Sequence, residues 1–430
     1  MVSSETAPFR LRPRHWVELV LRFDPTGQTL HLAVRDAGAT RSVSLDAAGL
    51  SLDGPATLHL ASSADAPHAT FDGRLEAPIL WTGTSADDAA LAGLAAHARG
   101  ETPRAGNLAA AWDFSRDIAS AAVKDLGPSG HHGHLVNLPT RAVKGSRWGG
   151  GEQSWRHAPR DYAAVHFHRD DLADAGWPVA AELPLPDDLE SGVYLIEISG
   201  AAGRETLPIV VRPKAPRAKL AFLASTFTWL AYVNDRCLLH GANPEMFANR
   251  LLVLTAGDCA LAAHPEYGLS LYDTHADGSG VSYASRRRPC LTLRHSQRAW
   301  QGAIGRSLWN FSLDLLVVSW LDSEGIAYDI VTDDDLDAQG AAALAPYRCV
   351  LTGSHPEYHT ARSHDAVGGF LDAGGRLVYL GGNGFYWRVS THPDHPETIE
   401  LRRAEDGNRS WASEPGEYYH AFDGAYGGLW

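Results

Sequence analysis

Side chains that could do chemistry crowd into one short stretch of the chain. Leu351-Thr-Gly-Ser-His-Pro-Glu-Tyr-His-Thr360 begins as an apolar run and then supplies His355, Glu357, Tyr358 and His359 in close succession. This pattern predicts a buried strand that delivers its polar side chains at its carboxyl end. Ligands bind at that edge in open α/β sheets, so the stretch is a candidate site.

A second apolar run predicts a neighbouring strand with its own polar residue at the end. Leu377-Val-Tyr-Leu380 is followed by the turn Gly381-Gly-Asn-Gly384. Parallel strands place their carboxyl ends at one edge of a sheet, so we expect Asn383 to lie beside His355 and Glu357.

The His355 and Glu357 pair allows two interpretations. The residues are two positions apart and share a face in a regular strand, although Pro356 between them favours a bend or a sheet edge. His355 could act as a general base, with Glu357 as its orienting partner or as a metal ligand. Alternatively, the pair caps a helix that follows the strand, and periodicity alone does not separate the two.

No conventional nucleophile accompanies these residues. A Gly-x-Ser-x-Gly elbow is absent from the strand ends, and Cys349 lies inside the predicted strand rather than after it. The region has the outline of a glutamine-amidotransferase-like sheet without its cysteine. A metal-activated water is therefore the natural candidate nucleophile.

A second group of possible metal ligands is His131-His-Gly-His134. Imidazoles are good ligands, but Asp125 is the only acid close by in the sequence. We favour a turn on the protein surface over a metal site for this cluster.

The elements that must position the first group follow a Pro-rich break at Pro213–Arg217. Residues 219–225 and 327–331 read as buried strands, residues 309–321 as an amphipathic helix, and Asp333–Asp337 as the acidic start of another helix. Strands that alternate with helices predict a parallel sheet, which we assign to an α/β domain over residues 215–430.

The chain before this break has a β pattern. Residues 16–23, 30–34 and 56–60 alternate apolar and polar side chains, and Asp87–His97 predicts a single helix among the strands. We expect a lectin-like β-sandwich over residues 1–150, because the aromatic residues and the Asp-Leu-Gly turn of residues 111–148 resemble the last part of a laminin-G or concanavalin-like sandwich. The chain before Trp16 is too short for the opening strands of such a domain, so we expect the sandwich to be incomplete. The runs 192–199 and 207–212 predict an immunoglobulin-like β linker over residues 151–214. The expected fold class is thus multidomain α+β and α/β.

Composition limits the class of protein. The chain has 430 residues, a formal net charge of −14 and 44% hydrophobic residues, which suits two or three globular domains. The negative charge argues against nucleic acid and anionic membranes as partners. We find no apolar stretch near twenty residues and no signal-peptide pattern, so we expect a cytoplasmic protein. The four widely spaced cysteines predict neither zinc binding nor disulfides.

The stretch from Lys219 to Trp430 resembles the large (beta) subunit of N,N-dimethylformamidase, a family of amide hydrolases. The motifs that carry the resemblance are Ala224–Asp235, Tyr267–Val281, Thr352–Tyr358, Gly381–Trp387, Gly416–His420 and Gly427–Trp430. It implies a mononuclear ferric iron held by Tyr232, Tyr272 and Glu357, with His355 and Asn383 as catalytic neighbours. Pattern alone does not single out the two tyrosines, because Tyr328, Tyr358 and Tyr386 are equally close to strand ends; we interpret these three as packing aromatics.

The chemistry that the resemblance implies is coherent. A phenol titrates near pH ~10, so it binds as phenolate only beside a strong positive charge such as a ferric ion. That ion would polarise an amide carbonyl and activate water, while His355 relays a proton and Asn383 orients the substrate. Nearby aromatic side chains suit small N-alkyl groups: Phe227, Trp229, Phe385 and Trp387.

The implied activity is the hydrolysis of small amides such as N,N-dimethylformamide to dimethylamine and formate. The resemblance also implies a small helical partner subunit and a homo-oligomer of large subunits. Because the family continues beyond the Gly-Gly-Leu-Trp motif, we expect the α/β domain to be truncated at its C-terminal end. The alternative is a glycan- or protein-binding sandwich with a degenerate, non-catalytic α/β domain.

Overall fold

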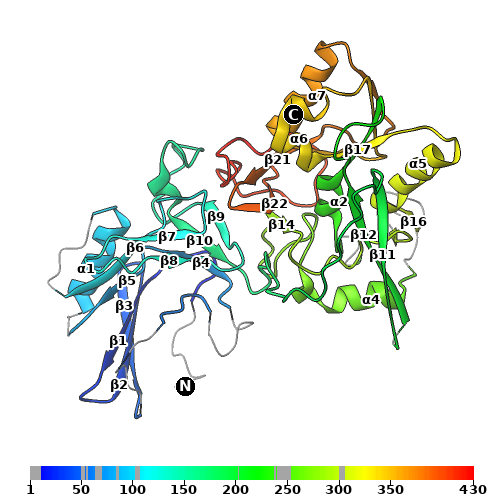
Figure 1. Ribbon diagram of the computed structural model, residues 1–430. Coiled ribbons are helices and arrows are strands. Elements are labelled where there is room, and N and C mark those ends of the chain that lie inside the picture. Colours follow the sequence, from blue (N-terminus) through cyan, green and yellow to red (C-terminus); the bar gives the residue numbers. More distant parts are fainter. Residues whose placement is uncertain are drawn as a thin grey trace. The chain divides into compact units, whose positions relative to one another are not determined.

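The computed structural model describes residues 11–49, 54, 57–62, 70–83, 87–101, 107–201, 203–236, 239, 253–299 and 306–430 (Figure 1). The chain forms two compact units, residues 1–169 and residues 170–430. Both contain β-sheets, and the second contains a sheet with helices on both faces. The expected mixed, multi-sheet α/β architecture is confirmed. The domain boundaries predicted near residues 150 and 214, and the three named domain types, stay predictions.

The first unit is built from antiparallel strands and one α-helix. One sheet has the order β1-β2-β3: Glu18–Asp24, Thr29–Asp36 and Ala39–Asp46. The second has the order β4-β10-β9: Gly73–Glu76, Ala164–Phe167 and Thr140–Val143. The third has the order β5-β6-β7-β8: Ile79–Trp81, Leu108–Asp113, Ala122–Asp125 and Gly133–His134. Helix α1 spans Asp87–Ala98, as predicted, and the 3-10 helix η1 spans Pro159–Tyr162.

One predicted strand of this unit was wrong. Residues 57–60 are exposed and belong to no strand, while residues 55 and 56 lie outside the described residues. The third strand of the first sheet is instead β3, whose side chains are mostly exposed. An edge strand needs few apolar residues because its backbone hydrogen bonds to β2 hold it in place, so hydrophobic alternation is a weak signal for it.

The Asp-Leu-Gly turn at residues 125–127 organises the core of this unit. The Asp125 carboxylate accepts hydrogen bonds from the backbone N–H groups of Ala111, Gly127 and His131. A Cβ on Gly127 would lie 2.8 Å from the Cα of Ala110, so only glycine allows this close approach. The buried core beside it contains Ala110, Trp112, Phe114, Ala121, Val123, Leu135 and Val165.

The second unit contains the predicted parallel sheet, which is confirmed. Its order is β17-β13-β18-β20, with bounds Asp329–Thr332, Leu220–Ala224, Cys349–Thr352 and Arg376–Val378. Because side chains alternate along a strand, Ala221 and Leu223 join a core on one face, and Phe222 and Ala224 join a core on the other.

Helices cover both faces of this sheet (Figure 1). Helices α6 (Asp333–Gln339) and α7 (Ala361–Asp372) contribute to the core with Leu223. Helices α2 (Thr226–Tyr232) and α5 (Phe311–Ser323) contribute to the core with Phe222. Continuous burial of the strands is what a parallel sheet between two helical layers requires. The other helical segments that the structure describes in this unit are α4 (Ala256–Ala263), η2 (Pro265–Tyr267) and η3 (Gly340–Ala343).

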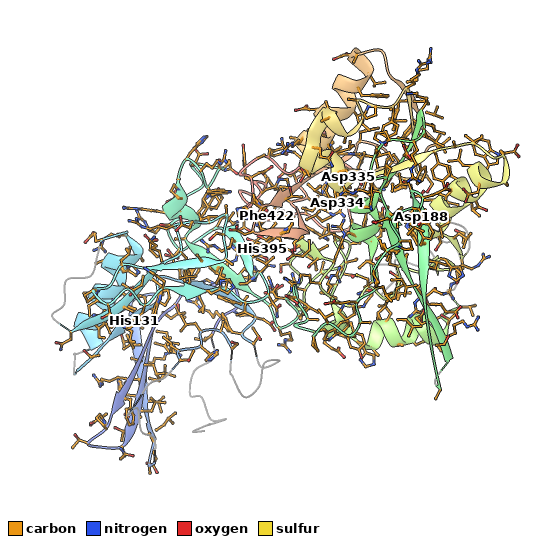
Figure 2. All side chains as sticks on the ribbon, viewed as in Figure 1. His131, Asp188, Asp334, Asp335, His395 and Phe422 are labelled. Carbon is orange, nitrogen blue, oxygen red and sulfur yellow. The ribbon has the colours of Figure 1, made fainter. Side chains whose placement is uncertain are left out.

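The acidic start of α6 explains why that helix begins where it does. Thr332 and Asp335 form a reciprocal capping box, and Asp335 also pairs with Arg212. Asp334 pairs with Arg286 and accepts a hydrogen bond from Thr226 at the start of α2 (Figure 2 labels Asp334 and Asp335). The predicted placement of these acids at the positive end of the helix is confirmed.

A second four-stranded sheet lies in the same unit, in the order β14-β22-β21-β19. Its strands are Tyr283–Ser285, His395–Leu401, Trp387–His392 and Tyr358–His359. Near its end, His395 stacks on Phe422 with ring centroids 5.9 Å apart (Figure 2). Two hairpins complete the unit: β11-β12 (Gly192–Gly200 and Gly203–Val211), which confirms the strands predicted there, and β15-β16 (Arg298–Ala299 and Ser307–Leu308).

The structure also bears on two expectations from the sequence, one about membrane-spanning helices and one about cysteines. No helix among the described residues is long and apolar enough to span a bilayer. Cys259, Cys290 and Cys349 are free thiols, and Cys259 is exposed rather than buried. Cys237 lies outside the described residues.

Candidate active site

Tyr232 is the last residue of helix α2, whereas we expected it in the loop after the first strand of the α/β domain. The helix follows β13 after a single residue, so it starts at the carboxyl edge of the parallel sheet. Asp333 accepts a hydrogen bond from the backbone N–H of Phe227 and holds the first turn. The helix forms because Phe227, Trp229 and other apolar residues along it are buried, and packing of this kind stabilises even a short helix.

Tyr272 lies in a tight turn that packs against the end of α2. The Asp273 carboxylate accepts hydrogen bonds from the backbone N–H and hydroxyl of Ser270, which closes the turn. The N–H of Leu271 donates to the carbonyl of Ala231 at 3.0 Å, so the turn is attached directly to the residue before Tyr232. As a result the rings of Tyr232 and Tyr272 stack, with centroids 4.2 Å apart.

Glu357 follows strand β18, as the sequence predicts, and it is only 2% exposed. Its backbone N–H donates to the carbonyl of His355 at 2.9 Å and to the hydroxyl of Thr228 at 3.0 Å. Its carbonyl accepts from the N–H groups of Tyr386 and Trp387. The backbone on both sides of the peptide is therefore held, and the carboxylate has a fixed direction.

Three oxygen-bearing side chains converge at this point. The Tyr232 hydroxyl donates to Oε2 of Glu357 at 2.8 Å, and the Tyr272 hydroxyl lies 2.5 Å from the Tyr232 hydroxyl. The Tyr272 hydroxyl is also 3.2 and 3.3 Å from the two carboxylate oxygens. The residues come from three segments that are far apart in sequence, and the structure brings all three predicted ligands together.

The electrostatics of the cluster keep both phenols protonated unless a cation is present. Burial raises the pKa of Tyr232 well above its usual value, and the charge of Glu357 adds to the rise. Burial likewise raises the pKa of Tyr272 well above its usual value, although the positive charge of Arg403 opposes the rise. A strong positive charge at the shared oxygens is what would turn these phenols into phenolates.

Two residues of the cluster were missed in the sequence. Tyr358, which we interpreted as a packing aromatic, is fully buried, and its hydroxyl donates to the Tyr272 hydroxyl at 2.7 Å. Arg403 is also fully buried and donates to the Tyr358 hydroxyl at 3.1 Å while its guanidinium lies over the Tyr272 ring, 4.5 Å from the centroid. The position of Tyr358 directly after Glu357 was a usable signal. Arg403 had none, because it is distant in sequence from every site motif.

His355 lies beside the carboxylate. Its Nε2 is 3.1 Å from Oε2 of Glu357, close enough for ion pairing although the angle is not that of a hydrogen bond. Its ring contacts Trp309, with centroids 5.2 Å apart. The helix-capping interpretation of the pair was wrong, because the next helix, α7, is capped by Thr360.

Asn383 is not drawn into this network. Asn383 is exposed on the loop after β20. Among the described residues, it forms no hydrogen bond with His355 or Glu357. The loop itself does reach the site, since a Cβ on Gly382 would lie 2.3 Å from Nδ1 of His355. We expected Asn383 itself to lie beside His355 and Glu357, and its place there and its role stay predictions.

A cavity of about 70 Å³ lies next to Tyr232. Its wall includes Trp229, Leu261, Trp309 and Phe311, with Asp235 and Asp258 among its polar residues. Trp309 also contacts the rings of Tyr232 and His355, so the cavity and the oxygen cluster share a wall.

The aromatic neighbours expected around a substrate divide into two kinds. Phe227 and Trp387 are fully buried in the core beneath the site, whereas Trp229 lines the cavity. Phe385 stacks on the ring of His359, with centroids 4.5 Å apart. Of the four, Trp229 is therefore the one that the cavity exposes to a ligand.

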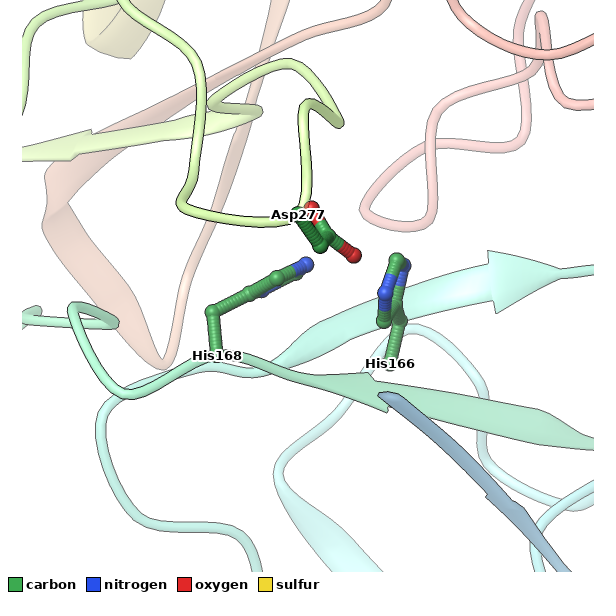
Figure 3. Close-up of side chains that lie close together, drawn as sticks. All are labelled: His166, His168 and Asp277. Carbon is green, nitrogen blue, oxygen red and sulfur yellow. The ribbon is translucent and has the colours of Figure 1, made fainter. Parts of the chain in front are cut away.

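The histidines of the first unit differ from these residues. His131, His132 and His134 are exposed around a turn, as we favoured (His131 is labelled in Figure 2). His166 and His168 lie at the end of β10 with ring centroids 4.1 Å apart (Figure 3).

Comparison of the sequence with known proteins shows the family of this chain. Residues 140–430 match the family model described as N,N-dimethylformamidase beta subunit-like, C-terminal. The chain is 38% identical over 368 residues to the N,N-dimethylformamidase beta subunit of Paracoccus aminophilus and 38% identical over 371 residues to that of an Alcaligenes species. Each alignment covers 84% of this chain and 47% of the relative, so the chain spans about half the length of these relatives. With the family model matching well over half of its residues, the chain belongs to the N,N-dimethylformamidase beta subunit family.

Proposed function

We propose that this chain carries the active site of an iron-dependent amidohydrolase that cleaves small N-substituted amides. N,N-dimethylformamide, giving dimethylamine and formate, is the substrate that the names of the two relatives point to. The observation that carries the proposal is the buried convergence of the Tyr232, Tyr272 and Glu357 oxygens. Structural cores rarely bring two phenols and a carboxylate together so closely, because a buried charge needs a partner.

The donor set fits a hard, highly charged cation. All three residues offer oxygen, which ferric iron prefers, and two phenolates with one carboxylate would balance a trivalent charge. Tyr232, Tyr272 and Glu357 would hold the ion. When bound, it would polarise the amide carbonyl and make water more acidic.

The chain's own residues would supply positioning and proton transfer. His355 would take a proton at Nε2 from the attacking water and deliver it to the nitrogen of the leaving amine. Thr228 and the backbone of residues 386–387 would hold Glu357 still while this happens. Asn383 would orient the substrate from its loop.

The cavity beside Tyr232 would accept the substrate. A water needs roughly 10–15 Å³ of such space, so a volume of about 70 Å³ accepts a molecule of about five non-hydrogen atoms. N,N-dimethylformamide is of that size. Trp229, Leu261 and Phe311 would contact its methyl groups. Removing these methyl groups from water lowers the free energy and so favours binding.

The wider assignments remain part of this proposal. They are a cytoplasmic location, a small helical partner subunit and pairing of large subunits. They also include a lectin-like sandwich, an immunoglobulin-like linker and an amidotransferase-like catalytic domain.

Metal analysis combined with visible absorption and an amide-hydrolysis assay tests the proposal. We expect about one iron per chain, a visible tyrosinate-to-iron absorption band, and release of dimethylamine. Removing iron with a chelator should abolish the band and the activity together, and adding ferric or ferrous iron in air should restore both. A colourless protein that binds no iron and hydrolyses no small amide would leave the alternative of a binding module with a degenerate α/β domain.

A further inference from the structure

A buried carboxylate outside the oxygen cluster connects the two segments that carry the site. Asp314 lies in the first turn of α5 and is 2% exposed. Its Oδ2 accepts a hydrogen bond from Nε1 of Trp229 at 2.8 Å. Its Oδ1 accepts two bonds from Ser354, one from the backbone N–H and one from the hydroxyl, both at 2.6 Å.

The first connection reaches the tyrosine that ends α2. Trp229 is three residues before Tyr232 on the same short helix. The Trp229 ring also packs edge-on against Phe311 of α5, with centroids 5.0 Å apart. The indole N–H bond fixes how α2 is rotated against α5, and with it the direction in which the Tyr232 ring leaves the helix.

The second connection reaches the histidine and the glutamate. Ser354 directly precedes His355 and is three residues before Glu357. At Gly353 a Cβ would lie 2.6 Å from Oδ2 of Asp314, so the loop can approach the carboxylate only because that residue is glycine. The loop is shaped around Asp314.

We propose that Asp314 is a positioning residue that holds Tyr232 and His355 in a fixed relation by binding Trp229 and Ser354. Its side-chain hydrogen bonds go to Trp229, which lines the cavity, and to Ser354, and none of them reaches the oxygen cluster directly. The inference rests on the proposed function, because it assigns the fixed relation to amide hydrolysis.

The chemistry of its partners requires a carboxylate at this position. Asp314 receives three donated hydrogen bonds, and a carboxylate has enough acceptor sites for all of them. An asparagine of the same shape would point its own NH₂ group at one of the donors. Asp314→Asn is therefore expected to break one connection without removing volume from the core.

Kinetics of matched variants test the assignment. We expect Asp314→Asn to lower kcat by about 10- to 100-fold, the scale that a displacement of about 1 Å produces, while the protein stays folded. Asp322→Asn is the control, because Asp322 is an exposed aspartate on the same helix. Unchanged kcat, KM and visible absorption in Asp314→Asn would overturn the proposal. A lowered melting temperature with unchanged kinetics would overturn it too, since that is a purely structural role.

The two connections can be separated. Ser354→Ala removes the hydroxyl bond, and we expect a lower kcat with an unchanged absorption band because His355 is displaced. Trp229→Phe removes the indole N–H, and we expect a shifted absorption band because Tyr232 is displaced. The effects of Asp314→Asn should appear in both readouts. If neither single variant moves its assigned readout, the connections do not position the site.

A measurement on metal-free protein distinguishes this inference from the proposed function. In protein labelled with ¹⁵N-histidine, the His355 signals can be assigned by comparison with His355→Ala. Asp314→Asn should shift these signals and Asp322→Asn should not. Unshifted signals would overturn the positioning role even if the enzyme is active. An inactive, iron-free protein with shifted signals would overturn the proposed function and keep the positioning.

Discussion

Two polar clusters in this protein differ in residue type and in surroundings. His131, His132 and His134 come from one turn of the first unit and are exposed. Tyr232, Tyr272 and Glu357 come from three separate segments of the second unit, and Glu357 is 2% exposed. The first cluster is the more obvious metal motif in the sequence, yet its side chains are exposed at the surface. The second is inconspicuous, but its oxygens face one another where water is excluded.

The difference shows that convergence under burial, rather than local density of ligands, indicates a site. A side chain in solvent gives up its hydration to bind an ion, whereas a buried polar group has already lost it. The two phenols and the carboxylate hydrogen bond to one another, and Tyr272 also accepts a bond from Tyr358, so their oxygens are grouped as the ligands of a cation would be.

Removing one oxygen ligand should have the largest effect. We expect Tyr232→Phe, Tyr272→Phe and Glu357→Gln each to remove most bound iron and the visible absorption, because each deletes an anionic ligand and keeps the shape of the side chain. Metal analysis of the purified variants measures this. Tyr328→Phe is the control, since the Tyr328 hydroxyl bonds to the exposed Asp322. Full iron content in both tyrosine variants would end the ligand assignment.

Removing the proposed acid–base group should have the next largest effect. We expect His355→Ala to retain iron and lose about 100-fold or more in kcat, the usual scale for a positioned acid or base. Steady-state kinetics with metal analysis on the same sample measure both quantities. Iron lost together with activity would instead make His355 a ligand, and the buried cluster would then be one residue larger.

A histidine buried among acids should make the stability of the protein depend on pH. Burial alone lowers the pKa of His275, but its hydrogen bond to Asp170 and the charges of Asp171 and Asp170 outweigh burial and raise that pKa above 6.5. The folded state therefore binds the proton more tightly than the unfolded state. The stabilisation is complete below about pH 6.5 and is lost as the pH rises through the raised pKa.

Denaturant unfolding of the protein and of His275→Gln between pH 6 and 9 measures this contribution. The difference in the free energy of unfolding between the two should shrink as the pH rises. A difference that is independent of pH would show that His275 binds its proton equally well in the folded and unfolded states.

Changing the exposed cluster should have the smallest effect. We expect His131→Ala combined with His134→Ala to leave iron content and kcat within about twofold of the unchanged protein, since exposed substitutions away from special features usually matter little. Loss of one metal equivalent in this variant would break the comparison, because it would make the surface turn a metal site.

Local sequence patterns anticipated the parts of the fold that depend on local forces. The runs before Ala224 and Thr352 predicted central strands because fully buried strands are continuously apolar. Asp333–Asp335 predicted a helix start because acids favour the positive end of a helix. The sequence patterns did not predict edge strand β3, because it depends on pairing with β2. They also did not predict that Tyr232 is helical, because α2 depends on packing between the parallel sheet and α5.

What the sequence by itself determined is the carboxyl edge where His355 and Glu357 emerge, together with the family motifs that contain Tyr232 and Tyr272. Only the tertiary structure decided which further groups meet there. Arg403 reaches Tyr358, and Asp314 reaches both Trp229 and Ser354, across separations in the chain that no periodicity records. The physical reason is that buried polar groups are stable only when they are hydrogen-bonded, and which groups bond to one another depends on how distant segments pack.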